Sequence, residues 1–394
     1  MTSPGELSQL ANQMWDSVVI GAGVAGCAYA IRSSQTGRKV LLVEACSFPR
    51  EKVCGGCLNP RAQAQLNELG VLDELLAKDA VVLNRLRIQI NEKVALWQVP
   101  QMLSIRRSTL DSALAARAVD CGTRFVDSTH GYVLPVEEKH DSNVRYVRLR
   151  NKLTNEEVLV TTKAIVIAAG LTRSPLPRDE HWMDEVMPKS RVGVHCLIPK
   201  TELVDSLCPM KLDNHTLNMT LRQHGYVGVC ETDGKWVDFA AAIDPKAIRE
   251  LGGIAQVIAS ILQPDHSKLL KLLKSQSWSA TTLLTRSSLT SAQDRMFLLG
   301  DSVGYVEPFT GEGMSWAFEG AKELFRLTHS VDINKPNEIE RKWNLWNNTH
   351  RQTRQRVCKW VASQTRHTFR AKFIVKTLDW MPRFRNLIIQ KAMQ

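Results

Sequence analysis

The sequence lacks the features of a membrane-spanning or secreted protein. No stretch of its 394 residues approaches the roughly 20 consecutive apolar residues that cross a bilayer. The N-terminal residues Met-Thr-Ser-Pro-Gly-Glu-Leu contain neither the basic nor the apolar region of a secretory signal. Nine cysteines, an odd number scattered through a long chain, are typical of reduced thiols rather than of a disulfide framework. We therefore expect a cytoplasmic globular protein without a metal site.

Acidic residues are almost missing from the C-terminal part of the chain. Residues 341–394 contain 13 Lys and Arg but one acid, Asp379, so they account for the net charge of +11 and leave the rest close to neutral. The aromatic residues among these charges include Trp343, Trp346, Trp360, Phe369, Phe373 and Trp380.

Three interpretations of this basic segment stay open. It can be a helical cover that packs its aromatic face on the rest of the protein with its charges in water, and we favour this one. It can also lie on an anionic membrane surface, which would make the protein membrane-associated, or dock on an acidic carrier protein. No motif for binding nucleic acid accompanies the charge.

What the sequence does contain is a dinucleotide-binding signature near its start. A short apolar run, residues 16–20, precedes Gly21, Gly23 and Gly26. In this turn the first glycine permits the bend, the second lets the backbone approach a pyrophosphate, and the third lets helix pack on strand. The helix expected over 24–33 points its free N–H groups at the phosphates.

A second strand is expected over 39–43, and Glu44 stands at its end. A carboxylate there accepts hydrogen bonds from the adenosine ribose hydroxyls. It also disfavours a 2′-phosphate, so NADP is not expected in this groove. Ala25 and Ala45, next to Gly26 and Glu44, are assigned to the same site.

A second glycine-rich block follows some 270 residues later, over 297–313. Asp301 comes after a buried strand and Gly300, where a carboxylate can reach a ribityl hydroxyl. Gly311, Glu312 and Gly313 open another helix, whose N-terminus would stabilise the negative charge of a reduced flavin. One fold uses both ends of its chain in this way for FAD.

The chain resembles the para-hydroxybenzoate hydroxylase superfamily of FAD enzymes, and within it the geranylgeranyl reductase-like group. The similarity spans about residues 14–330. It rests on the segments Gly-Ala-Gly-Val-Ala-Gly (21–26), Phe-Pro-Arg-Glu-Lys-Val-Cys-Gly-Gly-Cys-Leu-Asn-Pro-Arg-Ala (48–62), Arg-Ser-Thr-Leu-Asp (107–111) and the block at 300–313.

The resemblance implies roles for several further residues. Arg107 would contact the FAD phosphate and ribityl region, Asp301 would bind the ribityl chain, and residues 308–313 would border the isoalloxazine. Cys54 and Gly55 would lie beside the flavin ring.

The chain departs from the family at two places. The middle strand ends in Ala168-Ala169-Gly170 where the family has an Asp-Gly pair. The prenyl reductases' Tyr-x-Trp-x-Phe-Pro substrate motif keeps only its tyrosine, Tyr226.

The implied fold class is α/β, a Rossmann-type FAD-binding domain interleaved with an antiparallel-β substrate domain and followed by a helical tail. We assign 14–80, 104–175 and 286–330 to the FAD-binding domain. The β-rich substrate domain takes 81–103 and 176–285, and the basic helical region takes 331–394.

Cys54 and Cys57 are spaced as in a dithiol redox centre, which would need a lowered thiol pKa. The pair can instead be a wall of the flavin pocket, or be inert. We favour the pocket wall and expect Cys57→Ser to retain activity.

The sequence thus predicts an FAD-dependent oxidoreductase whose flavin is reduced by NADPH or NADH and passes hydride to an unsaturated small molecule, with a lipid or a polyketide-like compound as the candidate substrate. The alternatives are a monooxygenase acting through a C4a-hydroperoxyflavin and a non-enzymatic flavoprotein or electron carrier. No residue is assigned as general acid or base, and Cys54 is the only candidate for a catalytic side chain.

Overall fold

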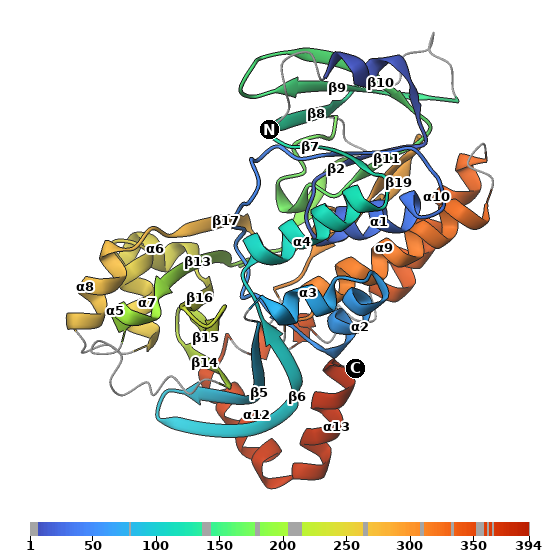
Figure 1. Cartoon of the computed structure of the whole chain (residues 1–394). Helices are drawn as coiled ribbons and strands as arrows, with labels where there is room; N and C mark the ends of the chain where they lie inside the picture. The colour runs from blue at the N-terminus through green and yellow to red at the C-terminus, as the bar shows by residue number, and fades with distance from the viewer. Residues whose placement is uncertain are drawn as a thin grey trace.

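In the computed structural model the described residues are 7–78, 80–135, 143–177, 182–203, 215–262, 267–307, 311–331, 335–351, 358–360, 362–364 and 366–393. They form an upper α/β body, a lower body around a large sheet, and a pair of C-terminal helices that protrudes at the bottom (Figure 1).

The upper body is built on a six-stranded sheet with the order β19-β20-β11-β2-β3-β7. The strands are β2 Ser17–Ile20, β3 Val40–Val43, β7 Arg124–Val126, β11 Ile165–Ile167, β19 Ala292–Gln293 and β20 Met296–Leu298. All neighbours are parallel except β19 and β20. The central strands are buried throughout because both faces of the sheet are covered.

Helices cover one face of this sheet and a second sheet covers the other (Figure 1). The main helices are α1 Val24–Ser34, α4 Arg107–Asp120 and α9 Gly313–Ser330. The covering sheet has the order β1 Met14–Trp15, β10 Glu157–Thr162, β9 Arg145–Asn151 and β8 Thr129–Val133. Smaller helices, α2 Pro60–Glu68, α3 Leu72–Ala77 and α10 Pro336–Trp346, pack around this body. The Rossmann-type α/β fold predicted from the sequence is therefore confirmed.

The lower body contains an eight-stranded sheet. In order along the sheet its strands are β17 Ser279–Leu283, β13 Val192–Pro199, β16 Trp236–Ile243, β15 Gly225–Thr232, β14 Thr216–Arg222, β5 Val81–Ile90, β6 Lys93–Ser104 and β4 Cys57–Leu58. The pairings are antiparallel, as expected, except that β14 runs parallel to β5. The long stretch of chain between these two strands provides the crossover connection that a parallel pair needs.

One face of the large sheet is covered by the helices α5 Lys200–Leu203, α6 Pro245–Leu251, α7 Ile254–Leu262 and α8 Ser267–Ser275. A small sheet, β12 Asp184–Val186, β18 Arg286–Ser288 and β21 Gly304–Tyr305, connects the two bodies. β12 and β18 come from segments that we assigned to different domains, so this shared sheet does not decide where one domain ends. The predicted domain boundaries stay a prediction.

The last two helices are α12 Thr368–Trp380 and α13 Pro382–Met393, and they pack on β5 and β6. No helix within the described ranges is both long and apolar enough to cross a membrane. The predicted inward aromatic face is wrong for these helices. Their small aliphatic residues Ala371 and Val375 are buried, whereas Phe369, Phe373 and Trp380 are exposed.

Candidate functional site

The turn between β2 and α1 leaves no room for side chains at two of its glycines. Gly21 has a φ of 111°, and a Cβ there would lie 2.4 Å from the carbonyl oxygen of Ala168. A Cβ on Gly26 would lie 1.9 Å from the carbonyl oxygen of Gly21. Helix α1 can approach the strand this closely only because both positions are glycine.

Gly23, by contrast, faces open space bounded by two guanidinium groups. The nearest atoms to a Cβ at Gly23 would be Nη2 of Arg107 and Nη2 of Arg50, both 3.7 Å away. The free N–H groups of α1 begin at this point. Backbone donors, a helix N-terminus and two cations meet here, which is the chemistry that binds a diphosphate.

The two arginines are held by one buried carboxylate. Asp111 accepts from Nη2 of Arg107 at 2.8 Å and from Nη1 of Arg50 at 2.9 Å. Burial of Arg107 disfavours its charge, but the charge of Asp111 outweighs this and raises the pKa of Arg107. Arg107 therefore stays cationic, and Asp111 fixes where its charge lies.

Glu44 is turned toward the backbone of the same turn. Its Oε2 accepts from the N–H of Ala22 at 2.9 Å and its Oε1 from the N–H of Cys46 at 3.0 Å, while Arg50 lies 3.2 Å from Oε2. Glu44 thus braces the turn, and Ala45 beside it is half-buried. The ribose contact expected of Glu44 stays a prediction.

A cavity of about 480 Å³ lies between the two bodies, within the usual range for small-molecule sites. The predicted residues that line it are Gly23, Ala25, Cys54, Gly55, Arg107, Gly300, Asp301, Gly311 and Gly313. The predicted residues that do not line it are Gly21, Gly26, Glu44, Ala45 and Glu312. Residues 308–310, also expected here, lie outside the described residues.

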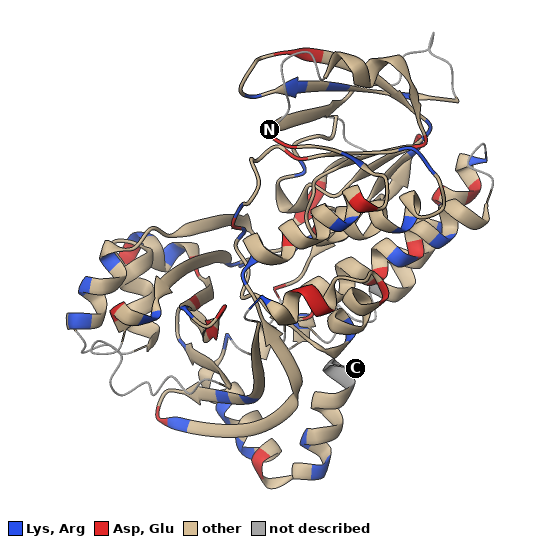
Figure 2. Ribbon diagram, in the orientation of Figure 1, with Lys and Arg blue, Asp and Glu red and all other residues tan. Residues whose placement is uncertain are grey.

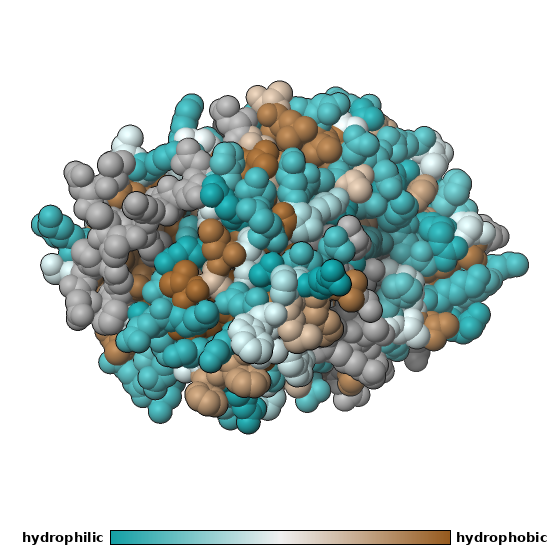
Figure 3. Space-filling model, turned by 90° about the horizontal axis from the view of Figure 1, so that it is seen from below, coloured by the Kyte–Doolittle hydropathy of each residue, from teal (hydrophilic) through white to brown (hydrophobic). Residues whose placement is uncertain are grey.

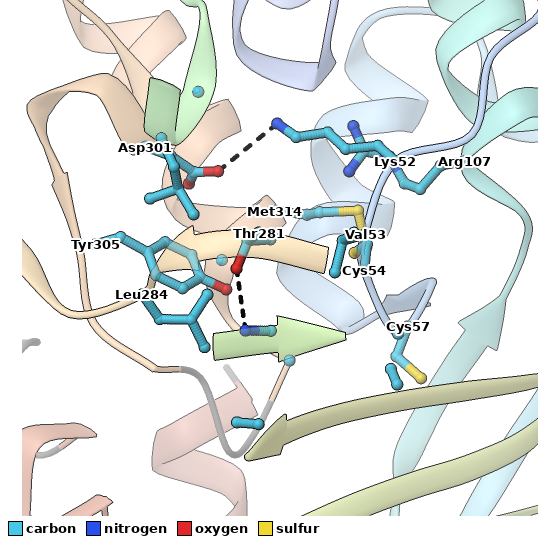
Figure 4. A pocket seen from close by; sticks show the side chains of 18 of the residues that line it. Lys52, Val53, Cys54, Cys57, Arg107, Thr281, Leu284, Asp301, Tyr305 and Met314 are labelled. Carbon is cyan, nitrogen blue, oxygen red and sulfur yellow. Dashed lines mark hydrogen bonds and ion pairs between the residues drawn. The ribbon is translucent and has the colours of Figure 1, made fainter. Parts of the chain in front are cut away.

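Asp301 and Lys52 face each other across the upper part of the cavity (Figure 4). Their Oδ2 and Nζ atoms are 3.7 Å apart, and both side chains are partly exposed. Gly300 has a φ of 62°, and a Cβ there would lie 2.9 Å from Cβ of Ala25, so Asp301 is brought close to the start of α1. Burial and the charge of Asp301 raise the pKa of the Tyr305 phenol well above its usual value, so Tyr305 stays neutral.

Cys54 and Cys57 have different surroundings in this structure. Both cysteines line the cavity, but Cys54 forms a hydrogen bond with Arg107, whereas Cys57 lies farther along the wall, away from Arg107 (Figure 4). A hydrogen bond with Cys230 and burial both raise the pKa of Cys57 well above the usual thiol value. A dithiol centre needs the opposite shift. The geometry therefore favours the pocket-wall interpretation of this segment.

The large sheet closes the cavity with small residues. Across β14, β15 and β16 the paired residues are Met219, Gly228 and Ala240. A Cβ on Gly228 would lie 3.0 Å from Sδ of Met219, and one on Gly55 would lie 3.4 Å from Cβ of Ala240. Larger side chains here would fill the space, so the size of the cavity depends on this row. The apolar residues around it are Leu86, Met102, Leu217, Met219 and Leu284.

The pair His195 and Asp238 lies on the same sheet, and both are buried. Oδ2 of Asp238 is 3.3 Å from Nε2 of His195, and Oδ1 has no hydrogen-bond partner among the described residues. Burial raises the pKa of Asp238. Burial disfavours the charged imidazole, but the hydrogen bond and charge of Asp238 outweigh this and raise the pKa of His195. Asp238 lines the cavity, so the pair can hold a proton at its wall.

The C-terminal region contacts two carboxylates next to the cavity, Glu307 and Glu312. Glu307 is fully buried, forms an ion pair with Arg191 at 2.9 Å and lies 3.7 Å from Nη2 of Arg366. Burial and the charge of Glu307 raise the pKa of Tyr226, which lines the cavity. Glu312, outside the cavity wall, accepts a hydrogen bond from Sγ of Cys358 at 3.0 Å.

Sequence reasoning missed Arg50, Lys52, His195 and Asp238. Arg50 and Lys52 stand in the segment 48–62 that carried the family resemblance, so that segment contained a usable signal. His195 and Asp238 interrupt otherwise apolar strands, which is a weak signal because a polar residue in such a strand can also face water.

The residues present fit FAD. The open position at Gly23 with Arg50 and Arg107 suits the diphosphate, and Lys52 and Asp301 suit the ribityl hydroxyls. Backbone from Gly311 and Gly313 and the side chains of Met314 and Ala317 line the side of the cavity where the flavin ring would lie.

Comparison with known proteins agrees with this fit. The FAD binding domain family matches residues 14–329. The chain is 36% identical over 342 residues to a menaquinone reductase of Mycobacterium tuberculosis (strain ATCC 25618 / H37Rv), which covers 81% of this chain and 77% of that protein.

Two solved structures share the fold. The flavin-dependent brominase Bmp2 has a TM-score of 0.74 at 16% identity, covering 96% of this chain and 93% of that one. A flavoprotein/dehydrogenase from Cytophaga hutchinsonii has a TM-score of 0.72 at 17% identity, covering 90% and 86%. The chain therefore belongs to the FAD binding domain family and is an FAD-dependent oxidoreductase.

Proposed function

We propose that this protein reduces a carbon–carbon double bond of an apolar, unsaturated, lipid-soluble substrate, with NADPH or NADH as the electron donor. The observation that carries the proposal is the wall of the cavity opposite the cofactor residues, where the large sheet contributes mostly small and apolar side chains. The similarity to a menaquinone reductase over most of the chain supports a reductase and suggests an isoprenoid quinone as the substrate class.

When bound, FAD would supply the hydride chemistry between the nicotinamide and the substrate. The protein's own residues would orient the cofactor and the substrate. Arg107 and Arg50, fixed by Asp111, hold the diphosphate end, and the row of Gly228 and Ala240 leaves space for a substrate beside the flavin ring.

An apolar substrate is favoured by the composition of this wall. The side chains of Leu86, Met102, Leu217 and Met219 give it no charge, and Asp238 is the one carboxylate that the large sheet contributes to the described lining. Transfer of a prenyl chain from water to such a surface is favourable, whereas a polar substrate would lose the hydrogen bonds of its hydration without replacement.

Reduction of a double bond adds one hydride and one proton to the two carbons. We propose that Asp238 donates this proton from Oδ1 and that His195, which contacts Oδ2, positions the carboxyl and returns a proton to it. Burial favours the protonated carboxyl, as a donor requires.

The test is an anaerobic reaction of the FAD-loaded protein with NADPH or NADH and a detergent-dispersed prenylated naphthoquinone. Mass spectrometry is expected to find two hydrogen atoms added to the side chain, and deuterium at the protonated carbon when the reaction runs in D2O. An unchanged side chain under these conditions contradicts the proposal. Incorporation of an oxygen atom when air is present would favour a monooxygenase instead.

A variant of the cavity wall sharpens the test. Gly228→Leu should stop reduction of the prenylated substrate while the flavin is still reduced by the nicotinamide, because the added side chain projects toward Met219 on the substrate side. A short-chain analogue provides the matched control. Gly228→Leu should lower the rate of its reduction less than the rate of reduction of the long-chain substrate.

A further inference from the structure

The two C-terminal helices, α12 and α13, form a hairpin whose inner face is fixed against the large sheet. We call residues 368–393 the C-terminal hairpin. Ala371, Val375 and Ile389 are buried in the cluster that also contains Met102, Met219 and Tyr226 of the cavity wall. Asp379 accepts a hydrogen bond from Nε1 of Trp97 at 2.7 Å and pairs with Lys93 at 3.1 Å.

The outer face of the hairpin is apolar and uncovered. Phe369, Phe373 and Trp380 are 83%, 65% and 89% exposed, and their spacing of four and seven residues keeps them within roughly 40° on one side of α12. Ala371 and Val375 lie on the opposite side of that helix.

The second helix continues this surface. Phe384, Leu387 and Ile388 of α13 share one face at i, i+3 and i+4, and Met381 is exposed at the turn. Figure 3 views the molecule from the end at which the hairpin protrudes, and apolar side chains lie there among hydrophilic ones. Single exposed apolar residues are ordinary, but a contiguous set on one element marks an interaction surface.

Positive charge borders this apolar surface. Arg370, Lys372, Lys376 and Arg383 are exposed on the hairpin, and Figure 2 shows basic residues along both helices. The hairpin's one acid, Asp379, is engaged by Trp97 and Lys93 on the sheet side. The partner should therefore be anionic and should offer an apolar layer behind its charges.

We infer that the C-terminal hairpin docks on the surface of an anionic phospholipid bilayer. Phe and Trp side chains settle at the boundary between headgroups and acyl chains, and Lys and Arg next to them contact lipid phosphates. A second copy of the chain would bring like charges together, so the charge argues against self-association. An acidic protein would satisfy the charge but needs a matched apolar surface for the exposed aromatics.

Docking also explains the position of the hairpin. The buried side of α12 packs on the same cluster of side chains that forms the apolar wall of the cavity. A bilayer at the outer side of the hairpin would therefore lie one helix layer away from the substrate wall, which suits a substrate dissolved in lipid.

The experiment is flotation of the full-length, FAD-loaded protein with vesicles of phosphatidylcholine alone and with phosphatidylglycerol added. We expect binding to the anionic vesicles that weakens at high salt, and little binding to the neutral ones. No substrate or nicotinamide is present, so the result is independent of the proposed reaction. Absence of binding to anionic vesicles, or equal binding to both kinds, overturns the inference.

Paired variants separate the hairpin from the rest of the surface. Lys372→Gln with Lys376→Gln should weaken binding roughly 30-fold, whereas Lys268→Gln with Lys271→Gln, exposed on α8, should not. Phe369→Ser with Phe373→Ser should weaken it roughly 10-fold or more, whereas Leu289→Ser, at a site 84% exposed, should leave it unchanged.

Every variant is first checked for FAD content and for flavin reduction by the nicotinamide, both of which should equal those of the parent protein. Hairpin variants that bind like the parent, or controls that lose binding to the same extent, contradict a docking surface on the hairpin. Capture of an acidic protein without vesicle binding contradicts it as well.

Discussion

The two sides of the cavity are built by different means. On the cofactor side, backbone atoms approach each other so closely that Gly21 and Gly26 admit no Cβ. On the substrate side, the nearest obstacle to a Cβ at Gly228 is the flexible end of Met219. Contacts between backbone atoms cannot adapt, whereas side chains can repack. The cofactor side therefore accepts only glycine at these positions, whereas the side chains of the substrate side can repack around different ligands.

The same substitution on the two sides should give the largest contrast. Gly26→Ala forces α1 off its strand and should cost more than about 3 kcal/mol and abolish FAD binding. Gly228→Ala should leave stability nearly unchanged, because the strand gains roughly 0.5–1 kcal/mol from losing a glycine while Met219 shifts. Urea unfolding and the ratio of FAD to protein measure both. Equal effects of the two substitutions would remove the contrast.

Arg107→Ala should cause the next largest loss of stability and of FAD affinity. It leaves Asp111 buried with half of its charge partners, and removing one member of a buried ion pair costs about 3–5 kcal/mol. FAD affinity, measured by flavin fluorescence, should fall at the same time. Arg50→Ala is the matched control, since that side chain also pairs with Asp111 but is less buried, and its loss should cost less.

Asp238→Asn probes the substrate side without disturbing the cofactor side. We expect reduction of the substrate to slow roughly 100-fold or more, with FAD content and flavin reduction unchanged. In the parent protein the rate should fall as pH rises through the raised pKa of the pair, because the proton is then lost. The variant should lack this fall. A variant with the parent's rate and pH profile would exclude Asp238 as the donor.

His195 should also couple stability to pH. Its pKa is raised by folding, so its stabilising contribution is complete below the unfolded pKa, near 6.5, and disappears as pH rises through the higher folded pKa. Unfolding of His195→Gln, compared with the parent on both sides of this window, should show a shallower dependence on pH. An unchanged dependence would mean that the imidazole does not gain its charge in the folded protein.

Cys57→Ser should have the smallest effect. The thiol is buried and hydrogen-bonded with Cys230, so its replacement should cost about 1 kcal/mol, while flavin content and turnover are retained. Cys54→Ser is the informative companion because Cys54 lies on the cavity wall and contacts Arg107. Loss of turnover in Cys57→Ser with normal flavin content would restore the dithiol hypothesis.

The contrast between the two sides explains what could be predicted from the sequence. The Rossmann strands, α1, α4, α9 and the residues around Gly23 and Asp301 depend on local spacing that glycines and apolar runs make visible. Asp238 and His195 meet only because β13 pairs with β16 in one register, and no local pattern specifies that register. The parallel pairing of β5 with β14 escaped prediction for the same reason.

The hairpin was misjudged for a different physical reason. Both sides of α12 carry apolar residues, Phe369 and Phe373 on one side and Ala371 and Val375 on the other. Periodicity reveals that a helix has two faces but does not say which face is covered. The aliphatic side packs in the cluster around β5 and β6, and the larger aromatic side is left outside.

The strand order of the six-stranded sheet has a consequence for biosynthesis. The central strand β11 lies between β2, made early, and β20, which ends at Leu298, and the helix that closes the cavity starts at Gly313. A nascent chain shorter than this holds the glycine turn of residues 21–26 without its opposite wall. We therefore expect a chain that ends before Gly313 to bind no FAD and to remain colourless.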